Sequence, residues 1–345
     1  MLLPTSDSPS LPDRATQHNA SIAAPAGEPE YLSESSPKDR PWDRHRSEAD
    51  RVASMYLNAS GWFHRLGERV EQCSQVLQFA WSPEKETPGA LTLKLRQAYF
   101  CRVRHCPVCQ WRRSLMWIAR FLEGAPRLLS QHPKARFIFL TLTRKNVPVG
   151  ELRSALQEMS DGWGRLSKRK EFSAVLGWLR TVEVTRGRDA TAHPHYHALL
   201  VVPSDYFRNP EEYLTHAGWT TLWRDSLRLD YDPIVHVTAV KSKCAARSSG
   251  RPSKPLLNAA RETLKYAVKP ADMSADADWF LELTCQLHRC RFIASGGILK
   301  NVLRERDEAN DDLLLLGDGE GGESPRLYFD WWRPVRRYKR RPFDP

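Results

Sequence analysis

Hydrophobic residues in the middle of the chain are spaced as β-strands require. The strongest run, Arg136–Thr143 (RFIFLTLT), is rich in β-branched and aromatic residues and is soon followed by Asn146 and Pro148, which favour a turn. Three later runs have the same character: Leu179–Arg186, His195–Val202 and Ile234–Val240. A short polar connection joins the first two of these later runs, so we expect them to form a hairpin.

The segments around these strands show helical spacing of apolar residues. They are Leu152–Phe172, Pro210–Leu229 and Leu256–Val268. The resulting order is β-α-β-β-α-β-α, and its first six elements match a ferredoxin-like split βαβ arrangement. The sequence therefore predicts an α+β fold with an antiparallel sheet that is covered by helices on one face. The other face is expected to be free to bind a partner.

Four regions follow from changes in composition along the chain. Residues 1–50 are rich in Ser, Pro, Ala and charge, lack an apolar period and are predicted to be a disordered arm. Residues 51–130 are basic and contain clustered cysteines, and residues 131–305 hold the predicted strands and helices as one domain. Residues 306–345 combine an acidic, Gly-rich linker with a basic, aromatic tail that we expect to be separate from the core.

The overall charge points to an anionic partner. The 345 residues include 52 Lys and Arg against 41 Asp and Glu, and the pI is about 9.4. Nucleic acid is the first candidate, and a merely soluble basic surface is the alternative. The N-terminus lacks the features of a secretory signal, and no stretch approaches the roughly 18 apolar residues that span a bilayer. We therefore expect a cytoplasmic protein with no membrane partner.

Three alternating histidines precede an apolar strand. His193, His195 and His197 can share one face because side chains of a strand alternate. If the hairpin is symmetric about Ala190, Glu183 lies opposite His197 and completes a metal site. Two imidazoles and a carboxylate suit Mn²⁺ or Mg²⁺ and leave open positions for phosphate oxygens. A lone histidine would instead favour a structural role.

The last predicted helix brings three reactive side chains together. Glu262, Tyr266 and Lys269 are four and three residues apart and would share a helical face. A tyrosine ionises near pH 10, so a nucleophilic role at neutral pH needs a nearby cation such as Lys269 or a metal ion. The alternative is an ordinary exposed face of a helix.

The segment CRVRHCPVCQWRR contains a tight group of thiols. Cys101, Cys106 and Cys109 have the spacing of a zinc knuckle, and Cys73 is the first candidate for a fourth ligand, with His105 or His64 as substitutes. A site closed by four ligands predicts structural Zn²⁺. The alternative is a set of unligated cysteines.

Basic residues near the cysteines and in the tail are candidates for contact with DNA. In the tail they alternate with aromatic rings, which suits phosphate contact and base stacking. The alternative is that these cations only solubilise the chain. The candidates are Arg102, Arg104, Arg112, Arg113, Arg336 and Arg337.

Taken in order, seven segments resemble the single-tyrosine plasmid rolling-circle replication initiators of the HUH endonuclease superfamily, over roughly Val70 to Lys300. They are EQCSQVLQF, FCRVRHCPVCQWRRS, RFIFLTLT, GWLRTVEVT, HPHYHALLVV, WTTLWRDSLRLDYDPIVHV and ETLKYAVK. The resemblance implies an HUH nuclease core preceded by a zinc knuckle. It also implies His195 and His197 as the metal-binding pair, Glu183 as third ligand, Tyr266 as nucleophile and Glu262 as the residue that activates water at termination. His193 is adjacent and the weaker candidate.

The implied function is site-specific nicking and strand transfer through a 5′-phosphotyrosine, which leaves a free 3′-hydroxyl primer. The expected partners are plasmid origin DNA, single-stranded or in a hairpin, and a host polymerase. A host helicase is also expected, because the sequence has no Walker loop of its own. One alternative is an HUH relaxase or single-strand transposase. The other is a non-enzymatic, zinc-dependent DNA-binding protein.

Overall fold

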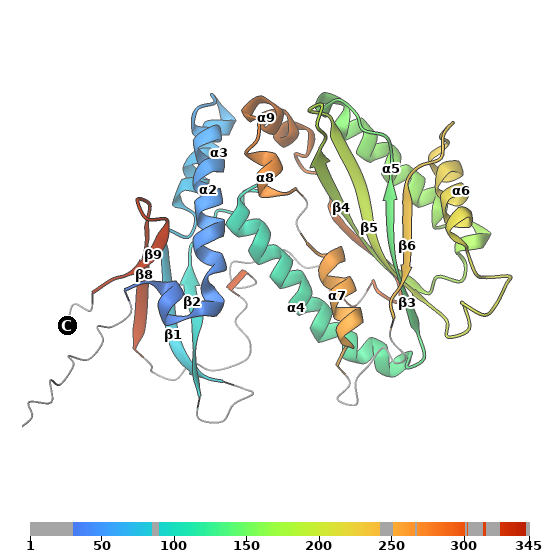
Figure 1. Ribbon diagram of the computed structural model, residues 1–345, viewed down its shortest axis with the longest axis horizontal. Coiled ribbons are helices and arrows are strands. Elements are labelled where there is room, and N and C mark those ends of the chain that lie inside the picture. The colour runs from blue at the N-terminus through green and yellow to red at the C-terminus, as the bar shows by residue number, and fades with distance from the viewer. Residues whose placement is uncertain are drawn as a thin grey trace, which may run out of the picture.

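Two antiparallel sheets organise the computed structural model of this chain (Figure 1). The structure describes residues 30–84, 90–241, 251–265, 268–300, 302, 313–314 and 325–342. Helices lie on both sides of the larger sheet and against the smaller one. The predicted α+β class with an antiparallel sheet is therefore confirmed.

The larger sheet has five strands in the order β6-β3-β5-β4-β7, and all neighbours are antiparallel. These strands are β3 (Arg136–Thr143), β4 (Gly177–Arg186), β5 (Ala192–Val202), β6 (Val235–Ala239) and β7 (Ile293–Gly297). Helix α5 (Leu152–Leu166) connects β3 to β4, and α6 (His216–Leu227) connects β5 to β6. Each βαβ unit encloses one strand of the other, which is what a split βαβ arrangement requires.

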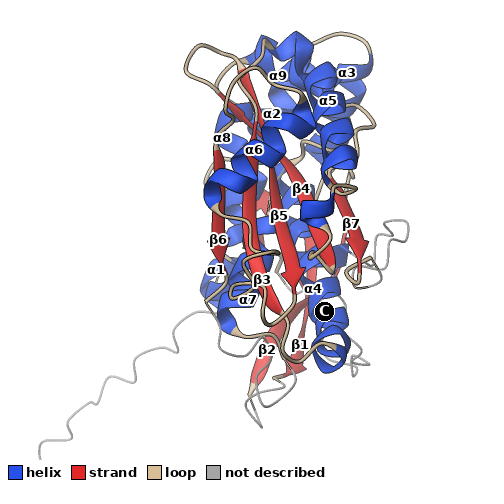
Figure 2. Cartoon of the chain, turned by 90° about the vertical axis from the view of Figure 1, so that its right-hand side faces the viewer, coloured by secondary structure: helices blue, strands red, loops and turns tan. Residues whose placement is uncertain are grey.

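The two faces of this sheet carry different cores. On β5, the even-numbered Tyr196, Ala198 and Leu200 belong to the core that includes α5 and α6, the side of the sheet that faces the viewer in Figure 2. The odd-numbered Leu199 and Val201 pack instead with residues of α4 (Pro107–Gln131) and α7 (Lys254–Thr263). The expectation of a sheet face left free to bind a partner is therefore wrong for this half of the sheet, because α4 and α7 present apolar stripes that cover it.

The smaller sheet joins the two ends of the described chain. Its strands run in the order β2-β1-β8-β9, with β1 (Val76–Pro83), β2 (Leu91–Ala98), β8 (Arg326–Trp332) and β9 (Arg337–Arg340). Phe329 and Tyr338 are fully buried. The predicted separate tail is therefore wrong for residues 326–340, because alternating aromatic residues there complete a sheet and its core.

The predicted disordered arm is also too long at its C-terminal end. Helices α1 (Leu32–Ser35) and α2 (Pro41–Leu57) lie partly within residues 1–50, with the short 3₁₀ helix η1 (Pro37–Asp39) between them, and α3 (Trp62–Gln72) follows. Trp42 is almost fully buried, and its ring contacts those of Trp111 and Tyr338 at centroid distances of 4.8 and 6.4 Å. A few large apolar residues therefore order a segment whose average composition is polar.

Helix ends differ from the predicted bounds where local capping decides them. Helix α6 starts at His216 because the Thr215 hydroxyl accepts a hydrogen bond from the Gly218 amide. The predicted helix 152–172 is divided into α5 and the short 3₁₀ helix η3 (Lys170–Phe172). The remaining helical elements are η2 (Val149–Glu151), α8 (Pro270–Met273) and α9 (Ala277–Gln286). Within the residues described, no helix is long and apolar enough to cross a membrane.

The burial of β8 makes the C-terminal segment necessary for stability. Phe329 packs edge-to-face on Phe79 with ring centroids 5.8 Å apart, so Phe329→Ala should lower the free energy of unfolding by about 3–5 kcal/mol. Val335→Ala, in the exposed turn after β8, should change it by less than about 0.5 kcal/mol. Urea denaturation followed by tryptophan fluorescence measures both, and equal stabilities would show that β8 does not belong to the cooperative unit.

Candidate active site

The hairpin of β4 and β5 brings Glu183 against two of the predicted histidines. Glu183 pairs with His195, and Thr181 pairs with His197. The predicted register, which placed Glu183 opposite His197, is therefore wrong by two residues. Glu183 nevertheless reaches both rings, because its Oε2 lies 2.8 Å from His197 Nε2 and 3.3 Å from His195 Nε2. The three ligand atoms form a buried group that can hold a metal ion.

Backbone and side-chain oxygens fix the orientation of both imidazoles. His197 Nδ1 lies 3.2 Å from Thr141 Oγ1 on β3, and His195 Nδ1 lies 3.3 Å from the carbonyl oxygen of His193. Each Nε2 therefore faces Glu183, an arrangement typical of metal-ligating histidines. His193 is half-buried, and its own ring lies beside the ring of His195 at 5.3 Å without joining the group of ligand atoms.

The charge at this site is unusual for a buried carboxyl group. Burial opposes ionisation of Glu183, but hydrogen bonds from His195 and His197 and the charge of Lys265 hold its pKa well below the usual range. Lys265 Nζ lies 3.3 Å from Glu183 Oε2. A carboxylate with two imidazole nitrogens aimed at one point is a donor set that can hold a divalent metal ion.

The segment with the predicted nucleophile is not one continuous helix. Helix α7 ends at Thr263, and Val268 instead forms a parallel bridge with Val184 of β4. The predicted shared helical face of Glu262, Tyr266 and Lys269 is therefore wrong, because the chain leaves the helix to reach the sheet. Tyr266 itself lies outside the described residues.

The residues around position 266 still meet the candidate metal site. Lys265 contacts both Glu183 and the more exposed Glu262, whereas Lys269 is exposed at the start of α8. Although burial opposes it, the pKa of Lys265 is raised by its contacts with Glu262 and Glu183. The cation beside the carboxylate is therefore Lys265, which the spacing of residues had not indicated.

The four predicted cysteines converge from distant parts of the chain. Cys73 follows α3, while Cys101, Cys106 and Cys109 surround the start of α4. Cys109 Sγ lies 3.6 Å from the sulfurs of both Cys73 and Cys101. These spacings match tetrahedral Zn²⁺, for which Zn–S bonds of about 2.3 Å place the sulfurs roughly 3.8 Å apart. Cys73 therefore completes the group, in preference to His105 or His64.

The electrostatics of the four thiols favour a bound cation. Burial raises the pKa of the Cys73 and Cys101 thiols. Burial acts on Cys106 in the same sense, but hydrogen bonds from its neighbours lower the pKa of this thiol. Without a cation, ionisation of Cys73 and Cys101 is disfavoured, because burial penalises the charged form. A divalent cation would offset that penalty.

Comparison with known proteins identifies the family. The family model described as "Replication protein" matches residues 92–339. The chain belongs to this family of replication proteins. It is 38% identical over 292 residues to a "Protein rep" of Lactiplantibacillus plantarum, with 81% of this chain and 87% of that protein covered. A "Protein rep" of Streptococcus pneumoniae is 33% identical over 288 residues, with 81% and 85% covered. No solved structure matches.

These relatives confirm the predicted resemblance to plasmid replication initiators. A 34% identical "Replication protein" of Staphylococcus aureus covers 56% of this chain and 84% of its own length. The candidate metal ligands Glu183, His195 and His197 lie within the matched residues 92–339, as do Cys101, Cys106 and Cys109, whereas Cys73 precedes them.

The predicted DNA-binding arginines of the replication protein separate into two groups. Arg102, Arg104 and Arg113 line one pocket, and Arg336 is exposed in the turn between β8 and β9. The prediction is wrong for Arg112, which is buried and donates to the carbonyl oxygens of Leu313 and Leu314. Arg337 pairs with Glu34 and Ser33; this contact holds the N-terminal segment on β9.

Thr141 contacts a candidate metal ligand, and the sequence did not indicate it as part of the site. Its position in RFIFLTLT places it on the same face as Phe139 and Thr143, but its contact with His197 depends on the pairing of β3 with β5. Thr141→Val should lower the affinity for Mn²⁺ about tenfold, because the ring loses the group that orients it. Calorimetric titration with Mn²⁺ measures this change.

Thr181→Val is the matched control for that experiment. Thr181 also pairs with His197, from the opposite strand, but its hydroxyl donates to the Thr263 carbonyl oxygen. The control should keep the wild-type affinity for Mn²⁺. Equal losses in the two variants would mean that general disturbance of the sheet, rather than ring orientation, controls metal binding.

The cysteine cluster predicts that metal removal destabilises the protein. Cys106→Ser should lose zinc and several kcal/mol of stability, because binding of a structural metal contributes directly to folding. Cys285→Ser removes a half-buried thiol outside the cluster and should retain the metal. Elemental analysis and thermal unfolding with and without a chelator test this, and a zinc-free wild type with full stability would contradict it.

Proposed function

We propose that this replication protein nicks one strand of plasmid origin DNA and becomes joined to it through Tyr266. The observation that carries the proposal is the convergence of Glu183, His195 and His197 beside Lys265, the residue that precedes Tyr266. On the other side of Tyr266, Val268 is bridged to Val184, next to Glu183. Lys265 and Val268 therefore both contact β4, the strand that carries the candidate ligand Glu183.

Glu183, His195 and His197 would hold Mn²⁺ or Mg²⁺. The bound cation would polarise the scissile phosphate and offset the charge that develops on its oxygens. Thr141 and the His193 carbonyl oxygen keep the two imidazoles aimed at that position. Three protein ligands leave coordination positions for oxygens of the DNA.

The bond changes in the proposed reaction are balanced. The Tyr266 oxygen forms a bond to phosphorus as the bond from phosphorus to the 3′ oxygen breaks. The leaving strand takes up a proton and ends in a 3′-hydroxyl, and the protein retains the 5′-phosphate. Tyrosine ionises near pH 10 in water, so the Lys265 ammonium favours the phenolate by its charge. The free 3′-hydroxyl then primes a host polymerase, and a host helicase opens the duplex.

Glu262 is the proposed base at termination. Its side chain is half-exposed and bonded to Lys265, so it is accessible to water at the edge of the site. There it would take a proton from a water molecule that attacks the phosphotyrosine. The four cysteines would bind Zn²⁺ and fix the start of α4, with no part in the chemistry.

Covalent capture tests the nucleophile. Tyr266→Phe should form no protein–DNA adduct with single-stranded oligonucleotides and Mn²⁺, because only the attacking oxygen is removed. Folding and DNA binding should persist. Adducts are detected by denaturing gel electrophoresis with end-labelled DNA.

Tyr231→Phe is the control, since the Tyr231 hydroxyl accepts a hydrogen bond from the Lys145 amide and has no proposed role in cleavage. It should form adducts as the wild type does. An adduct on the Tyr266→Phe protein would assign the nucleophile elsewhere. Absence of any adduct on the wild type, with DNA still bound, would instead favour a non-enzymatic DNA-binding protein.

A further inference from the structure

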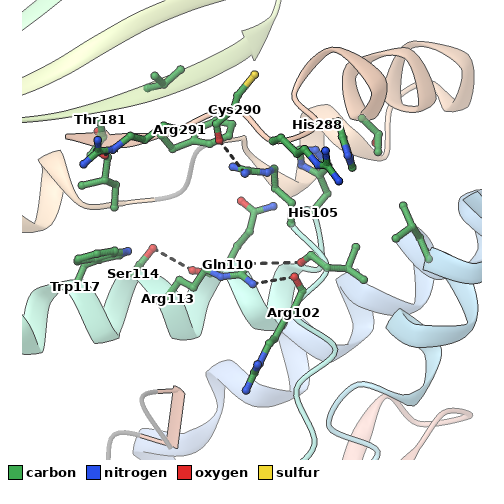
Figure 3. A pocket seen from close by; sticks show the side chains of 18 of the residues that line it. Arg102, His105, Gln110, Arg113, Ser114, Trp117, Thr181, His288, Cys290 and Arg291 are labelled. Carbon is green, nitrogen blue, oxygen red and sulfur yellow. Dashed lines mark hydrogen bonds between the residues drawn. The ribbon is translucent and has the colours of Figure 1, made fainter. Parts of the chain in front are cut away.

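A pocket of about 710 Å³ lies between the loop that contains Arg102–His105, helix α4 and the segment that enters β7. In Figure 3, Gln110, Ser114 and Trp117 rise from α4 on one side, while Thr181, Cys290 and Arg291 border the other. The pocket adjoins the candidate active site through two of its lining residues. Lys265 lines the pocket and contacts Glu183, and Thr181 lines it and pairs with His197.

The lining of this pocket is strongly cationic. No acidic side chain occurs among the described residues that form it, although the whole chain has 41 Asp and Glu. A pocket with one sign of charge concentrates ligands of the other sign. The cations are Arg69, Arg102, Arg104, Arg113, Lys265, Arg289 and Arg291.

Two buried polar side chains in the lining point to a ligand with hydrogen-bonding groups. His105 is 1% exposed, and neither ring nitrogen has a hydrogen-bond partner in the described part of the chain. Gln110 is 7% exposed, and its Oε1 is likewise unpartnered there, while its Nε2 faces Met273 Sδ at 3.7 Å. Buried polar atoms without partners are costly. A ligand with donors and acceptors would satisfy them.

Flat side chains add a third property. Trp117 and Phe292 both line the pocket, and the Arg104 guanidinium lies over the Phe292 ring at 4.4 Å. Aromatic rings and guanidinium planes are the surfaces on which unpaired bases stack. A lining with cationic side chains, aromatic rings and a glutamine suits a nucleotide better than it suits a simple anion.

We propose that this pocket takes one unpaired nucleotide of the strand that is cut, close to the scissile phosphate, and selects its base. Gln110 and His105 contact the edge of the base, and the arginines at the rim, Arg102 among them, hold its phosphates. Glutamine has both a donor and an acceptor and so distinguishes bases by their edges. The volume is in the range that buries a ligand of nucleotide size. The placement next to the cut rests on the proposed nicking function, and the base selection does not.

The test uses the full chain and a pool of single-stranded oligonucleotides with a randomised central segment. One sample is selected for equilibrium binding without added metal ion, and a second is selected for covalent adducts with Mn²⁺. Sequencing both pools gives the base preference at every position. The wild type should prefer one base at one position in the bound pool, and the same preference should lie beside the cut in the adduct pool.

Gln110→Leu keeps the size of the side chain and removes its hydrogen bonds, so the preference at that position should fall about tenfold or more. Gln131→Leu makes the same change at the far, exposed end of α4 and should retain the preference. Arg102→Gln should weaken binding of all sequences alike and lower the salt dependence by about one counterion.

The two selections separate the two proposals. If the preference persists in Gln110→Leu, or if the wild type has none, the assignment of the pocket is wrong whatever the adduct pool shows. If Gln110→Leu loses the preference in the bound pool while no adducts form with any protein, the pocket assignment stands and the nicking function fails. A preference far from the cut would overturn the placement of the pocket beside the scissile phosphate.

Discussion

The alternation of side chains along β5 is the constraint on which the rest of this structure depends. Odd positions place Leu199 and Val201 beneath α4 and α7 and, further along the same face, His195 and His197 at the candidate metal site. Even positions place Tyr196 in the opposite core. A slip of one residue would bury the histidines among aromatic rings and expose Tyr196. Because β5 is paired on both edges, by β3 and β4, that slip is strongly opposed.

The cysteine cluster provides a second constraint, which links the two sheets. It fixes the start of α4 to Cys73, at the entrance to the smaller sheet, while Phe121, Leu128 and Leu129 of the same helix pack on the larger sheet. Helix α4 therefore reaches from the smaller sheet to the larger sheet (Figure 1). The cationic pocket lies along this helix, so its shape depends on the cluster even though no cysteine of the cluster lines it.

The distribution of charge suits a reaction at a phosphodiester. The buried carboxylate of Glu183 is confined to the position where a cation would bind, and Lys265 Nζ lies 3.3 Å from the same carboxylate oxygen that faces the two histidines. The arginines lie in the adjoining pocket, where the described lining has no acid to compete with phosphate. A strand that crosses both regions would meet the metal ligands at one phosphate and the arginines at its neighbours. Lys265 joins the two regions, because it lines the pocket and also pairs with Glu183 and Glu262.

The sequence by itself determined the split βαβ order of β3 to β6 with α5 and α6, and it indicated the four cysteines and Glu183, His195 and His197 as candidate ligands. Period-two alternation and the spacing of Cys and His residues are local properties, which is why they can be recognised in a sequence. Tertiary structure decided the rest. The pairing of β4 with β5 places Glu183 opposite His195, because the geometry of the turn fixes the register of a hairpin.

Adjacent Arg112 and Arg113 have different surroundings because neighbouring helical residues point about 100° apart. Arg112 points into the core, and Arg113 points towards the pocket. Lys265, Thr141 and Gln110 gained their contacts from elements distant in sequence. The end of α7 at Thr263 could not be predicted from its helical pattern, because what ends it is the pairing of Val268 with β4.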